Sequence, residues 1–457
     1  MATKFSIDLT VHGNSVKIII TLKVVLEYVI EILVDNAELF SVGVFMKRDL
    51  YTRQLVRKMH NGMIKVVTGI RRCGKSYLLF NLFRNHLVSE NVPEDHILEM
   101  AFDLYENKKF QNPEVFYPHI KSQIKDGGMY YVLLDEVQLL GDFEAILNSL
   151  LRMQNVDVYV TGSNAKFLSK DVITEFRGRG DQIHLYPLSF AEFLQAYKGS
   201  SIEAWREYSM YGGLPKLLDI SDDRDKAVYL ESIFSETYLK DILERNDVRN
   251  TNEISELFDF IASSVGGLSN PKKLSDTFKS VKNVSIHPDT IKTYLDYFEE
   301  SFLISRAVRY DIKGKKYINT PSKYYFTDMG LRNARLHFRQ YEETHIMENI
   351  IYNELLTRGY SVDVGVVEVT ERTAEQKKVQ KQLEVDFVCN LGSSRLYIQS
   401  ALSISDAQKE KQEQNSLERI PDSFEKIIIV KDIPTHYNDS GILILNLFDF
   451  LMNTNPF

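Results

Sequence analysis

The sequence predicts an α/β fold that begins with a doubly wound parallel sheet and continues into a helical stretch and two mixed modules. Three observations carry this prediction. A glycine-rich turn at residues 69–76 joins an apolar strand to an amphipathic helix, and apolar strands then alternate with helices up to residue 186. Near Gly266 the alternation stops and basic residues accumulate. Strands that alternate with helices of ordinary length favour a parallel sheet with helices on both faces.

The turn reads Gly-Ile-Arg-Arg-Cys-Gly-Lys-Ser over residues 69–76 and fits the pattern G-x-x-x-x-G-K-[ST]. Residues 65–68 before it form a predicted buried strand, and residues 77–87 form a predicted helix. The glycines let backbone N–H groups turn inward, and the helix adds the positive end of its dipole, so the turn suits a polyphosphate. We expect the following residues to bind the nucleotide: Gly69, Ile70, Arg71, Arg72, Cys73, Gly74, Lys75, Ser76 and Tyr77.

Within this turn, Lys75 is expected to reach the β and γ phosphates, and Ser76 is expected to give its hydroxyl to Mg²⁺. A second apolar strand, residues 130–134, ends in Asp135 and Glu136. Asp135 would hold the Mg²⁺ shell, while Glu136 would polarise the attacking water. The alternative, a glycine-rich turn without a ligand, is disfavoured because two motifs of one site occur together. ATP and Mg²⁺ are therefore the predicted cofactors.

Further strands are predicted at residues 97–102 and 156–161, with helices at residues 113–125 and 143–153. Ligands of such sheets bind at the carboxyl ends of the strands. Asn164 follows the last of these strands and is expected to orient the attacking water. It would equally well cap the helix that follows, and the two roles are compatible.

Two arginines, Arg177 and Arg179, alternate with glycines just before a predicted strand at residues 182–186. A guanidinium grips phosphate oxygens in two places and stays charged, so one of them is a candidate arginine finger. A neighbouring subunit of a homo-oligomer would supply it. The alternative is a solvated basic turn, and the sequence does not decide between the two.

Five segments together resemble a known family: residues 69–76, 134–138 (Leu-Asp-Glu-Val-Gln), 161–164 (Thr-Gly-Ser-Asn), 176–179 (Phe-Arg-Gly-Arg) and 211–215 (Tyr-Gly-Gly-Leu-Pro). From about Met46 to the end, the chain is similar to prokaryotic AAA-type ATPases that carry a C-terminal domain of unknown function, DUF4143. The resemblance implies a P-loop NTPase fold of AAA type that hydrolyses ATP. It also implies that Gly213 and Pro215 lie against the nucleotide base, where the residues alone indicate a turn.

The chain divides into five predicted parts: an N-terminal appendage at 1–45, a P-loop ATPase core at 46–186, a helical lid at 187–265, a winged-helix-like domain at 266–340 and a DUF4143-like, nuclease-fold domain at 341–457. Residues 16–34 are apolar, but four charged residues interrupt them, which argues against a membrane span. Residues 1–45 fall outside the resemblance. They are either a strand–helix appendage or the product of a start codon assigned too early.

The winged-helix prediction rests on the order of elements in residues 266–340. Two predicted helices, at residues 272–278 and 287–298, precede a hairpin whose turn holds Lys313, Lys315 and Lys316. The segment contains 14 Lys and Arg against 7 Asp and Glu, whereas the whole chain has a net charge of -8. This asymmetry favours DNA as a partner. The alternative is contact with the ATPase core or with an unidentified protein.

Residues 341–457 contain a predicted helix with Glu348, a strand with Asp386 and a neighbouring strand with Gln399. This set is similar to the restriction-endonuclease-like nuclease core, in which acids hold Mg²⁺ and a lysine steadies the attacking water. Here the lysine position is Ala401, so metal affinity and water activation should both fall. We interpret the site as degenerate, unless Lys409 moves into place from the following helix.

The composition, 44% hydrophobic and 26% charged, is ordinary for a globular protein, and its two cysteines give neither a disulfide framework nor a metal-ligand spacing. We expect a cytoplasmic protein without a membrane segment. The predicted function is Mg²⁺-dependent ATP hydrolysis coupled to action on an unidentified macromolecule. Two alternatives stay open: a nucleotide-dependent switch that binds a protein partner with little turnover, and an ATP-powered nuclease, which Ala401 disfavours.

Overall fold

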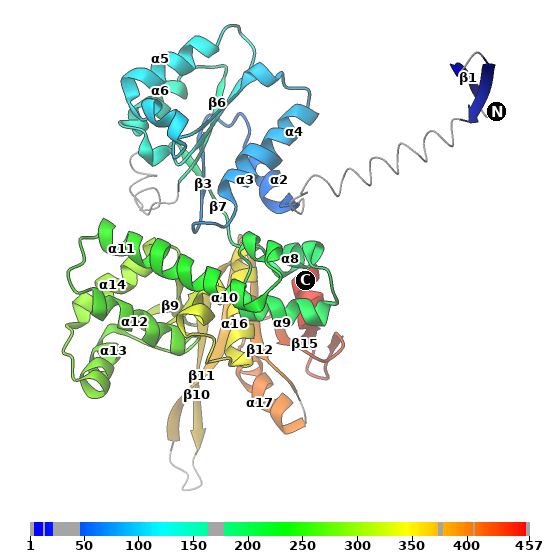
Figure 1. Cartoon of the computed structure of the whole chain (residues 1–457). Helices are drawn as coiled ribbons and strands as arrows, with labels where there is room; N and C mark the ends of the chain where they lie inside the picture. The colour runs from blue at the N-terminus through cyan, green and yellow to red at the C-terminus, as the bar shows by residue number, and fades with distance from the viewer. Residues whose placement is uncertain are drawn as a thin grey trace. The chain divides into compact units, whose positions relative to one another are not determined.

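The computed structural model describes residues 4–11, 14–21, 46–162, 178–372, 378–404 and 407–453. The chain divides into two compact units, residues 1–46 and residues 47–457 (Figure 1). The first unit holds an antiparallel hairpin of β1 (Lys4–Val11) and β2 (Asn14–Thr21). A strand–helix appendage is predicted there. Its strand part is this hairpin, and residues 22–45 lie outside the described part.

A five-stranded parallel sheet forms the first part of the second unit. Its strands are β3 (Ile64–Thr68), β4 (Ile97–Ala101), β5 (Tyr130–Asp135), β6 (Val156–Thr161) and β7 (Gly180–His184). The spatial order is β4-β5-β6-β3-β7, so β3, which leads into the glycine-rich turn, lies between β6 and β7. This agrees with the parallel sheet that the sequence predicts.

Helices cover both faces of this sheet. Successive residues of each strand point to opposite faces and therefore belong to two different apolar cores. Val66 and Val132 belong to the core that includes α5 and α6, whereas Val67 and Leu133 belong to the core that includes the helix after the glycine-rich turn. Most residues of the buried strands are apolar, which is why these strands are readily predicted. The helical elements of this part are α2 (Asp49–Arg57), α3 (Lys75–Tyr77), η1 (Leu78–Phe83), α4 (Arg84–Ser89), η2 (Glu94–His96), η3 (Tyr105–Gln111), α5 (Pro113–Gln123), η4 (Val137–Leu139) and α6 (Phe143–Leu150).

A mainly helical segment follows the sheet, as predicted for residues 187–265. Its elements are α8 (Phe190–Ala196), α9 (Ser201–Tyr211), η6 (Pro215–Asp219), α10 (Asp223–Ser232), η7 (Ile233–Leu239), α11 (Lys240–Arg245) and α12 (Thr251–Ser263). Capping boxes fix the starts of α8 and α9, because Ser189 and Ser200 each exchange two hydrogen bonds with a glutamate three residues later. Apolar residues of η7 to α12 share one core with the helix after the glycine-rich turn.

Residues 266–340 contain the predicted order of helix, turn, helix and hairpin. The elements are α13 (Pro271–Thr277), η8 (Phe278–Lys282), α14 (Pro288–Glu300), β8 (Ile304–Asp311), β9 (Lys316–Phe326) and α15 (Met329–Arg335). The structure differs from a free-standing module in one respect. Strand β8 pairs in parallel with β10, where Arg309 lies opposite Val364, so the hairpin belongs to the sheet of the C-terminal part.

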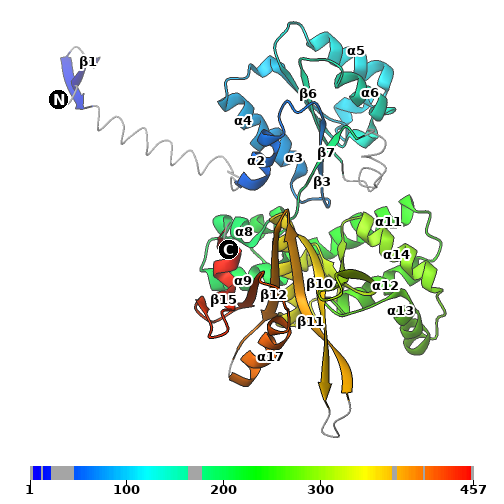
Figure 2. The same ribbon diagram turned by 180° about the vertical axis from the view of Figure 1, so that it is seen from behind.

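That C-terminal sheet has eight strands in the order β14-β15-β13-β12-β11-β10-β8-β9. Its remaining elements are α16 (Glu343–Thr357), β10 (Ser361–Arg372), β11 (Lys378–Leu391), β12 (Ser394–Ala401), α17 (Ala407–Glu418), β13 (Glu425–Val430), β14 (His436–Tyr437), β15 (Leu443–Asn446) and α18 (Leu447–Met452). Strands β10 and β11 stay paired as far as Arg372 and Lys378. The two strands form a long ribbon (Figure 2).

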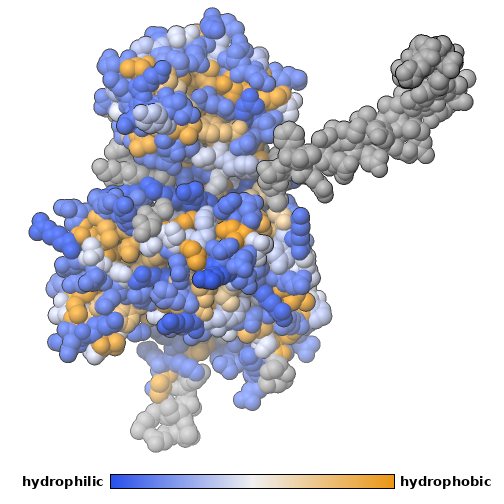
Figure 3. All heavy atoms as spheres, viewed as in Figure 1, coloured by the Kyte–Doolittle hydropathy of each residue, from blue (hydrophilic) through white to orange (hydrophobic). Residues whose placement is uncertain are grey.

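Apolar and polar side chains are interspersed on the surface. On the face drawn in Figure 3, hydrophobic residues lie in separate groups among hydrophilic ones. Within the described part of the chain, no helix is long and apolar enough to cross a membrane. Of the apolar residues 16–34, those at 16–21 belong to β2, and the others lie outside the described residues.

Candidate functional site

The glycine-rich turn, residues 69–74, connects β3 to α3. Gly69 has a φ of +144°, and a Cβ there would lie 2.1 Å from the carbonyl oxygen of Leu185, so glycine alone fits this close approach. Gly74 has a φ of +100° and caps α3 in the left-handed region. The pattern G-x-x-x-x-G-K therefore encodes two backbone requirements of this turn, which we call the phosphate loop.

Lys75 begins the helix after the phosphate loop and is almost completely buried. Its Nζ donates hydrogen bonds to the carbonyl oxygens of Gly69 and Ile70 at 3.1 and 3.0 Å. The ammonium thus lies inside the loop, at the centre of the nest that the sequence predicts. Neutral carbonyl groups hold it there, and a more negative ligand such as a phosphate would compete for it.

Ser76, Asp135 and Thr161 meet at the carboxyl ends of neighbouring strands. Ser76 Oγ donates to Asp135 Oδ2 at 2.7 Å, and the Thr161 hydroxyl donates to Asp135 Oδ1. The Thr161 hydroxyl in turn accepts from the backbone N–H of Glu136 at 3.1 Å. Burial raises the pKa of Asp135, while the two hydroxyl donors oppose this rise. A nearby cation would favour the charged carboxylate, which is the form that binds a metal.

These residues fit Mg²⁺ by their chemistry. Ser76 and Asp135 offer oxygen ligands within hydrogen-bonding distance of each other, and Mg²⁺ prefers oxygen ligands and keeps several water molecules. Glu136 directly follows Asp135 and has a left-handed backbone with a φ of +51°. Its carboxylate accepts from the side-chain amide of Gln138. Ser76, Asp135 and Glu136 thus lie near one another at the carboxyl end of β5, and the roles predicted for them stay predictions.

The helical segment contacts the phosphate loop directly. Tyr238 donates its hydroxyl to the carbonyl oxygen of Arg71 at 2.6 Å, and Arg71 forms an ion pair with Asp241 at 2.7 Å. Pro215 also lies beside the loop, because a Cβ placed on Gly74 would be 3.9 Å from Pro215 Cγ. The family resemblance implies that Pro215 lies against the nucleotide base, and its contact with the loop is compatible with that position.

Gly213 is held by a buried carboxylate of the C-terminal part. Its N–H donates to Asp328 Oδ2 at 2.7 Å, and the N–H of Leu331 donates to the other carboxylate oxygen at 3.1 Å. Burial raises the pKa of Asp328 to about 6, and these backbone N–H groups oppose the rise. A Cβ on the neighbouring Gly212 would lie 2.2 Å from this carboxylate, which explains a second glycine. Sequence reasoning missed Asp328, since its partner is more than a hundred residues away.

Arg48 is another residue that sequence reasoning missed. It is 3% exposed, and its guanidinium donates to the carbonyl oxygens of Cys73 at 3.1 Å and Tyr186 at 2.8 Å. It also pairs with Glu192 at 3.0 Å. Arg48 therefore fixes the phosphate loop against the start of α8. No local signal in the sequence sets this arginine apart from the other basic residues of an amphipathic helix start.

The remaining predicted catalytic residues are Asn164, Arg177 and Arg179. Asn164 and Arg177 lie outside the described residues. Arg179 is exposed and directly precedes β7, where its carbonyl oxygen accepts from the N–H of Ile64 at 2.8 Å. It lies at the amino end of β7, whereas the phosphate loop follows the carboxyl end of β3. Five strand residues separate the two ends, roughly 16 Å, so Arg179 does not reach the phosphates of its own subunit.

The predicted nuclease-like residues come together in the C-terminal sheet, but around a lysine. Lys323 Nζ on β9 lies 2.8 Å from Glu348 Oε1, 2.8 Å from Glu384 Oε1 and 3.7 Å from Asp386 Oδ1. We call these four side chains the carboxylate pocket. Gln399 lies beside it, where its Oε1 accepts from the N–H of Asp386 at 3.4 Å. Sequence reasoning missed Lys323, which it counted only among the basic residues of 266–340.

The lysine in the carboxylate pocket is Lys323 and not Lys409, the candidate from the following helix. Lys409 Nζ donates to Ser403 Oγ at 3.2 Å, and the cation in the pocket comes from β9. Burial alone would lower the pKa of Lys323, yet the surrounding carboxylates raise it above its usual value. Burial raises the pKa of Asp386 to about 7, and the charge of Glu348 adds to the rise. Among the described residues, no group of three or more His, Cys, Asp or Glu is arranged to hold a metal ion.

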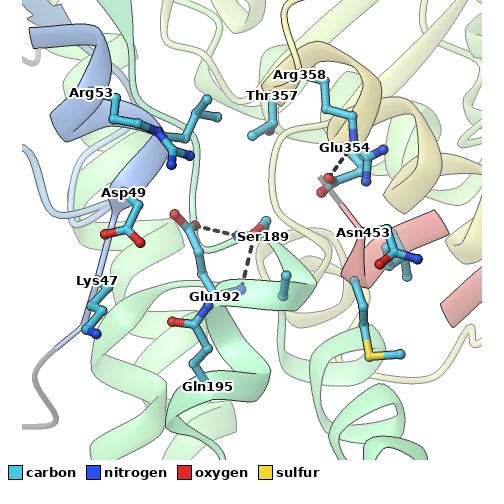
Figure 4. A pocket seen from close by; sticks show the side chains of 14 residues that line it. Lys47, Asp49, Arg53, Ser189, Glu192, Gln195, Glu354, Thr357, Arg358 and Asn453 are labelled. Atoms are coloured by element: carbon cyan, nitrogen blue, oxygen red, sulfur yellow. Dashed lines mark hydrogen bonds and ion pairs between the residues drawn. The ribbon is translucent and has the colours of Figure 1, made fainter. Parts of the chain in front are cut away.

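A separate cavity of about 590 Å³ lies away from the phosphate loop (Figure 4). Residues from α2, α8, α16 and α18 line it, among them Arg53, Glu192 and Glu354. Several of its charged groups are already paired, since Arg358 binds Glu354 at 2.8 Å and Glu192 closes the capping box of α8. No motif in the sequence predicts a site here, and the mixture of paired charges does not favour one class of ligand.

Comparison with known proteins agrees with the class of protein that the fold and the loop define. The family described as AAA domain matches residues 61–194, and a domain of unknown function, DUF8612, matches residues 202–342. The chain is therefore a nucleotide-binding protein of the P-loop class with an AAA domain. The DUF4143 resemblance stays a prediction, because the domain matched after the AAA domain is DUF8612.

Curated relatives match nearly the whole chain. An uncharacterized protein of Haemophilus influenzae is 33% identical over 413 residues, which cover 89% of this chain and 98% of the relative. An uncharacterized protein of Methanocaldococcus jannaschii is 26% identical over 427 residues, which cover 90% of this chain and 89% of the relative. The chain belongs to the same family as the Haemophilus influenzae protein.

Solved structures match with low overall similarity. The Aeropyrum pernix ORC1 protein, in a structure with DNA, is 11% identical and has a TM-score of 0.30, with 65% of this chain and 93% of that chain covered. Caenorhabditis elegans PCH-2 is 19% identical and has a TM-score of 0.26, with 56% of this chain and 70% of that chain covered. Scores this low do not establish a shared arrangement of the whole chains, and nothing about partners follows from them.

Proposed function

We propose that this protein is a Mg²⁺-dependent ATPase that hydrolyses ATP to ADP and phosphate and couples the reaction to a change in its helical segment. The observation that carries the proposal is the hydrogen bond between Ser76 and Asp135 at the mouth of a loop whose centre is Lys75. A lysine, a hydroxyl and a carboxylate in this arrangement supply the phosphate contact and two metal ligands. The AAA domain match over residues 61–194 supports the same activity.

The residues act by exchanging partners. Lys75 would leave the carbonyl oxygens of Gly69 and Ile70 and bind the β and γ phosphates, which are stronger acceptors. Ser76 and Asp135 would hold the metal, which neutralises charge on the phosphates when bound. Glu136 would then accept a hydrogen bond from the attacking water, because it follows Asp135 at the same edge of the sheet. Asn164 and a finger from Arg177 or Arg179 of a neighbouring subunit complete the proposed machinery.

The coupling part of the proposal rests on the contacts of the helical segment with the loop. Tyr238 and Asp241 both bind Arg71, and Pro215 lies against Gly74. A nucleotide that widens or tightens the loop would therefore move η7 and α11 through short polar contacts. Such a change gives the segment over residues 187–265 the role of a lid, which the sequence predicts by resemblance.

DNA is the proposed macromolecular partner, and one observation supports it. Lys313, Lys315 and Lys316 are exposed in the turn between β8 and β9. Other positive charges of this segment are used internally, since Lys323 and Arg332 are buried. The basic surface is thus smaller than the charge count indicates. The alternative function is a switch in which the bound nucleotide controls binding of an unidentified protein partner. The winged-helix and DUF4143 assignments are part of the DNA proposal.

Steady-state phosphate release tests the ATPase. The wild-type protein should release phosphate with Mg²⁺, and Glu136→Gln should bind ATP with unchanged affinity but lose turnover by a factor on the order of 10² to 10⁴, since it keeps the shape and loses the base. Addition of duplex DNA to both proteins tests the partner. ATP binding without phosphate release in the wild type, with or without DNA, would favour the switch and contradict the ATPase.

A further inference from the structure

The carboxylate pocket is built from three elements that are far apart in the sequence. Glu348 comes from α16, Glu384 and Asp386 come from β11, and Lys323 comes from β9. Strands β9 and β11 are not neighbours, because β10 and β8 lie between them in the sheet order. The ion pairs therefore join parts of the sheet that main-chain hydrogen bonds do not join.

The carboxylates are oriented by groups of the protein itself. Tyr325 donates its hydroxyl to Glu348 Oε1 at 2.6 Å, and the N–H of Ser400 donates to Asp386 Oδ2 at 2.8 Å. With these bonds in place, the three carboxylates converge on the ammonium of Lys323, at 2.8, 2.8 and 3.7 Å. An ammonium donates three hydrogen bonds and accepts none, so it suits the centre of three acceptors.

The three carboxylates are chemically suited to a divalent cation, although the described residues include no group arranged to hold one. Hard cations such as Mg²⁺ take carboxylate oxygens as ligands, and three carboxylates around one point are a common donor set for them. Lys323 is buried and occupies that point, so a metal ion there would face the positive charge of the ammonium at short range. The pocket does not fit a resident metal while the lysine is in place.

We propose that the ammonium of Lys323 takes the place of a divalent cation among these three carboxylates, and that removal of this amine opens the pocket to Mn²⁺ or Mg²⁺. The pocket thus holds the hairpin β8–β9 to α16 and β11 without a metal. Its outer member, Glu384, has a 37% exposed side chain, which gives an ion from solution a way in. This inference goes beyond the proposed ATPase function and does not depend on it.

Mn²⁺ titration of the full chain without nucleotide tests the proposal, read by the paramagnetic resonance of unbound Mn²⁺. Wild type and Asp386→Asn should bind Mn²⁺ equally, because neither offers the pocket to a metal. Lys323→Ala should gain one additional Mn²⁺ site, and Lys323→Ala combined with Asp386→Asn should lose it again. Lys323→Arg is the matched control and should gain no site, since it keeps a cation.

Two results would overturn the proposal. The first is a Mn²⁺ site in the wild type that disappears in Asp386→Asn, which would make the pocket a working metal site. The second is a folded Lys323→Ala protein that gains no site. If Lys323→Ala and Lys323→Gln unfold in metal-free buffer, circular dichroism is measured after addition of Mn²⁺ or of NaCl at equal ionic strength. Refolding with Mn²⁺ but not with NaCl supports the proposal, and failure to refold with Mn²⁺ contradicts it. ATP hydrolysis is measured separately, so either proposal can fail alone.

Discussion

Replacement of Lys75 by alanine is the most direct perturbation of the phosphate loop. In the structure the Lys75 ammonium is buried and bonded to two carbonyl oxygens, at 3.0 and 3.1 Å. A unit charge about 4 Å from a phosphate, at an effective dielectric constant near 20, contributes roughly 4 kcal/mol. Release of the two carbonyl contacts costs about 1 kcal/mol of this. The net loss of about 3 kcal/mol corresponds to an affinity for ATP that is on the order of 100-fold weaker.

Titration calorimetry with Mg²⁺ and ATP measures this loss. The control is Lys58→Ala, which removes the same charge from the same part of the chain. Lys58 pairs with Asp181, and Asp181 lies opposite Lys65, away from the loop end of β3. We expect Lys58→Ala to bind ATP with an affinity within about 3-fold of wild type, because surface pairs contribute little. A folded Lys75→Ala protein that binds ATP as tightly as the control would refute the assignment of the loop.

Three further predictions concern other parts of the site. Asp328→Asn should make the free energy of unfolding less dependent on pH between about 4 and 6, because an amide does not titrate. Because burial raises the pKa of Asp328 to about 6, above that of an unfolded aspartate, its contribution to stability is lost as pH rises from about 4 through 6. Denaturant melts over this range should show a flatter profile for the variant, and parallel profiles would contradict the pKa. Alanine at Lys313, Lys315 and Lys316 together should weaken DNA binding at low salt and lower the salt slope by about one unit for each lost phosphate contact. Equal affinities across a salt series would point to a protein partner. Arg179→Ala should lower turnover on the order of 10³-fold if it is a finger, and phosphate release should recover when it is mixed with the Lys75 variant. No recovery, with turnover independent of protein concentration, would exclude the subunit-interface role.

The loop and the sheet were predictable because their signals are local. A strand buried on both faces is apolar at most positions, with Lys65 and Asp157 as buried exceptions here, and the loop pattern states where the backbone needs glycine. The reason for Gly69, however, is tertiary: its partner in the close contact is the carbonyl of Leu185, which directly follows the neighbouring strand β7. The pattern predicts the residue without revealing what it touches.

The lysine of the carboxylate pocket could not be predicted, because charge counts assume that charged residues are exposed. Lys323 lies 25 positions before Glu348 and was counted among the basic residues available to DNA. In the structure it is buried, and so is Arg332, whose Nε donates to the carbonyl oxygen of Ala262 at 2.8 Å. A lysine at the start of the apolar stretch Lys-Tyr-Tyr-Phe, residues 323–326, is the one local sign of its burial. The hairpin that carries Lys323 joins the C-terminal sheet because the apolar residues of the hairpin need a covered face.

A short series of non-covalent contacts joins the phosphate loop to the carboxylate pocket, and this yields a final prediction. Pro215 lies against Gly74, and Gly213 binds Asp328. Asp328 follows β9, the strand that holds Lys323. We expect ATP to change backbone hydrogen exchange along β9, because movement of Pro215 acts on that strand through Asp328.

The comparison needs four samples: wild type and Asp328→Asn, each with and without ATP. A change in β9 that is present in wild type and lost in Asp328→Asn would show that the carboxylate transmits it. Physical proximity alone does not establish coupling, so the variant is the decisive sample. If ATP changes exchange around the phosphate loop but leaves β9 identical in all four samples, the two sites act independently, and the lid movement ends in the helical segment.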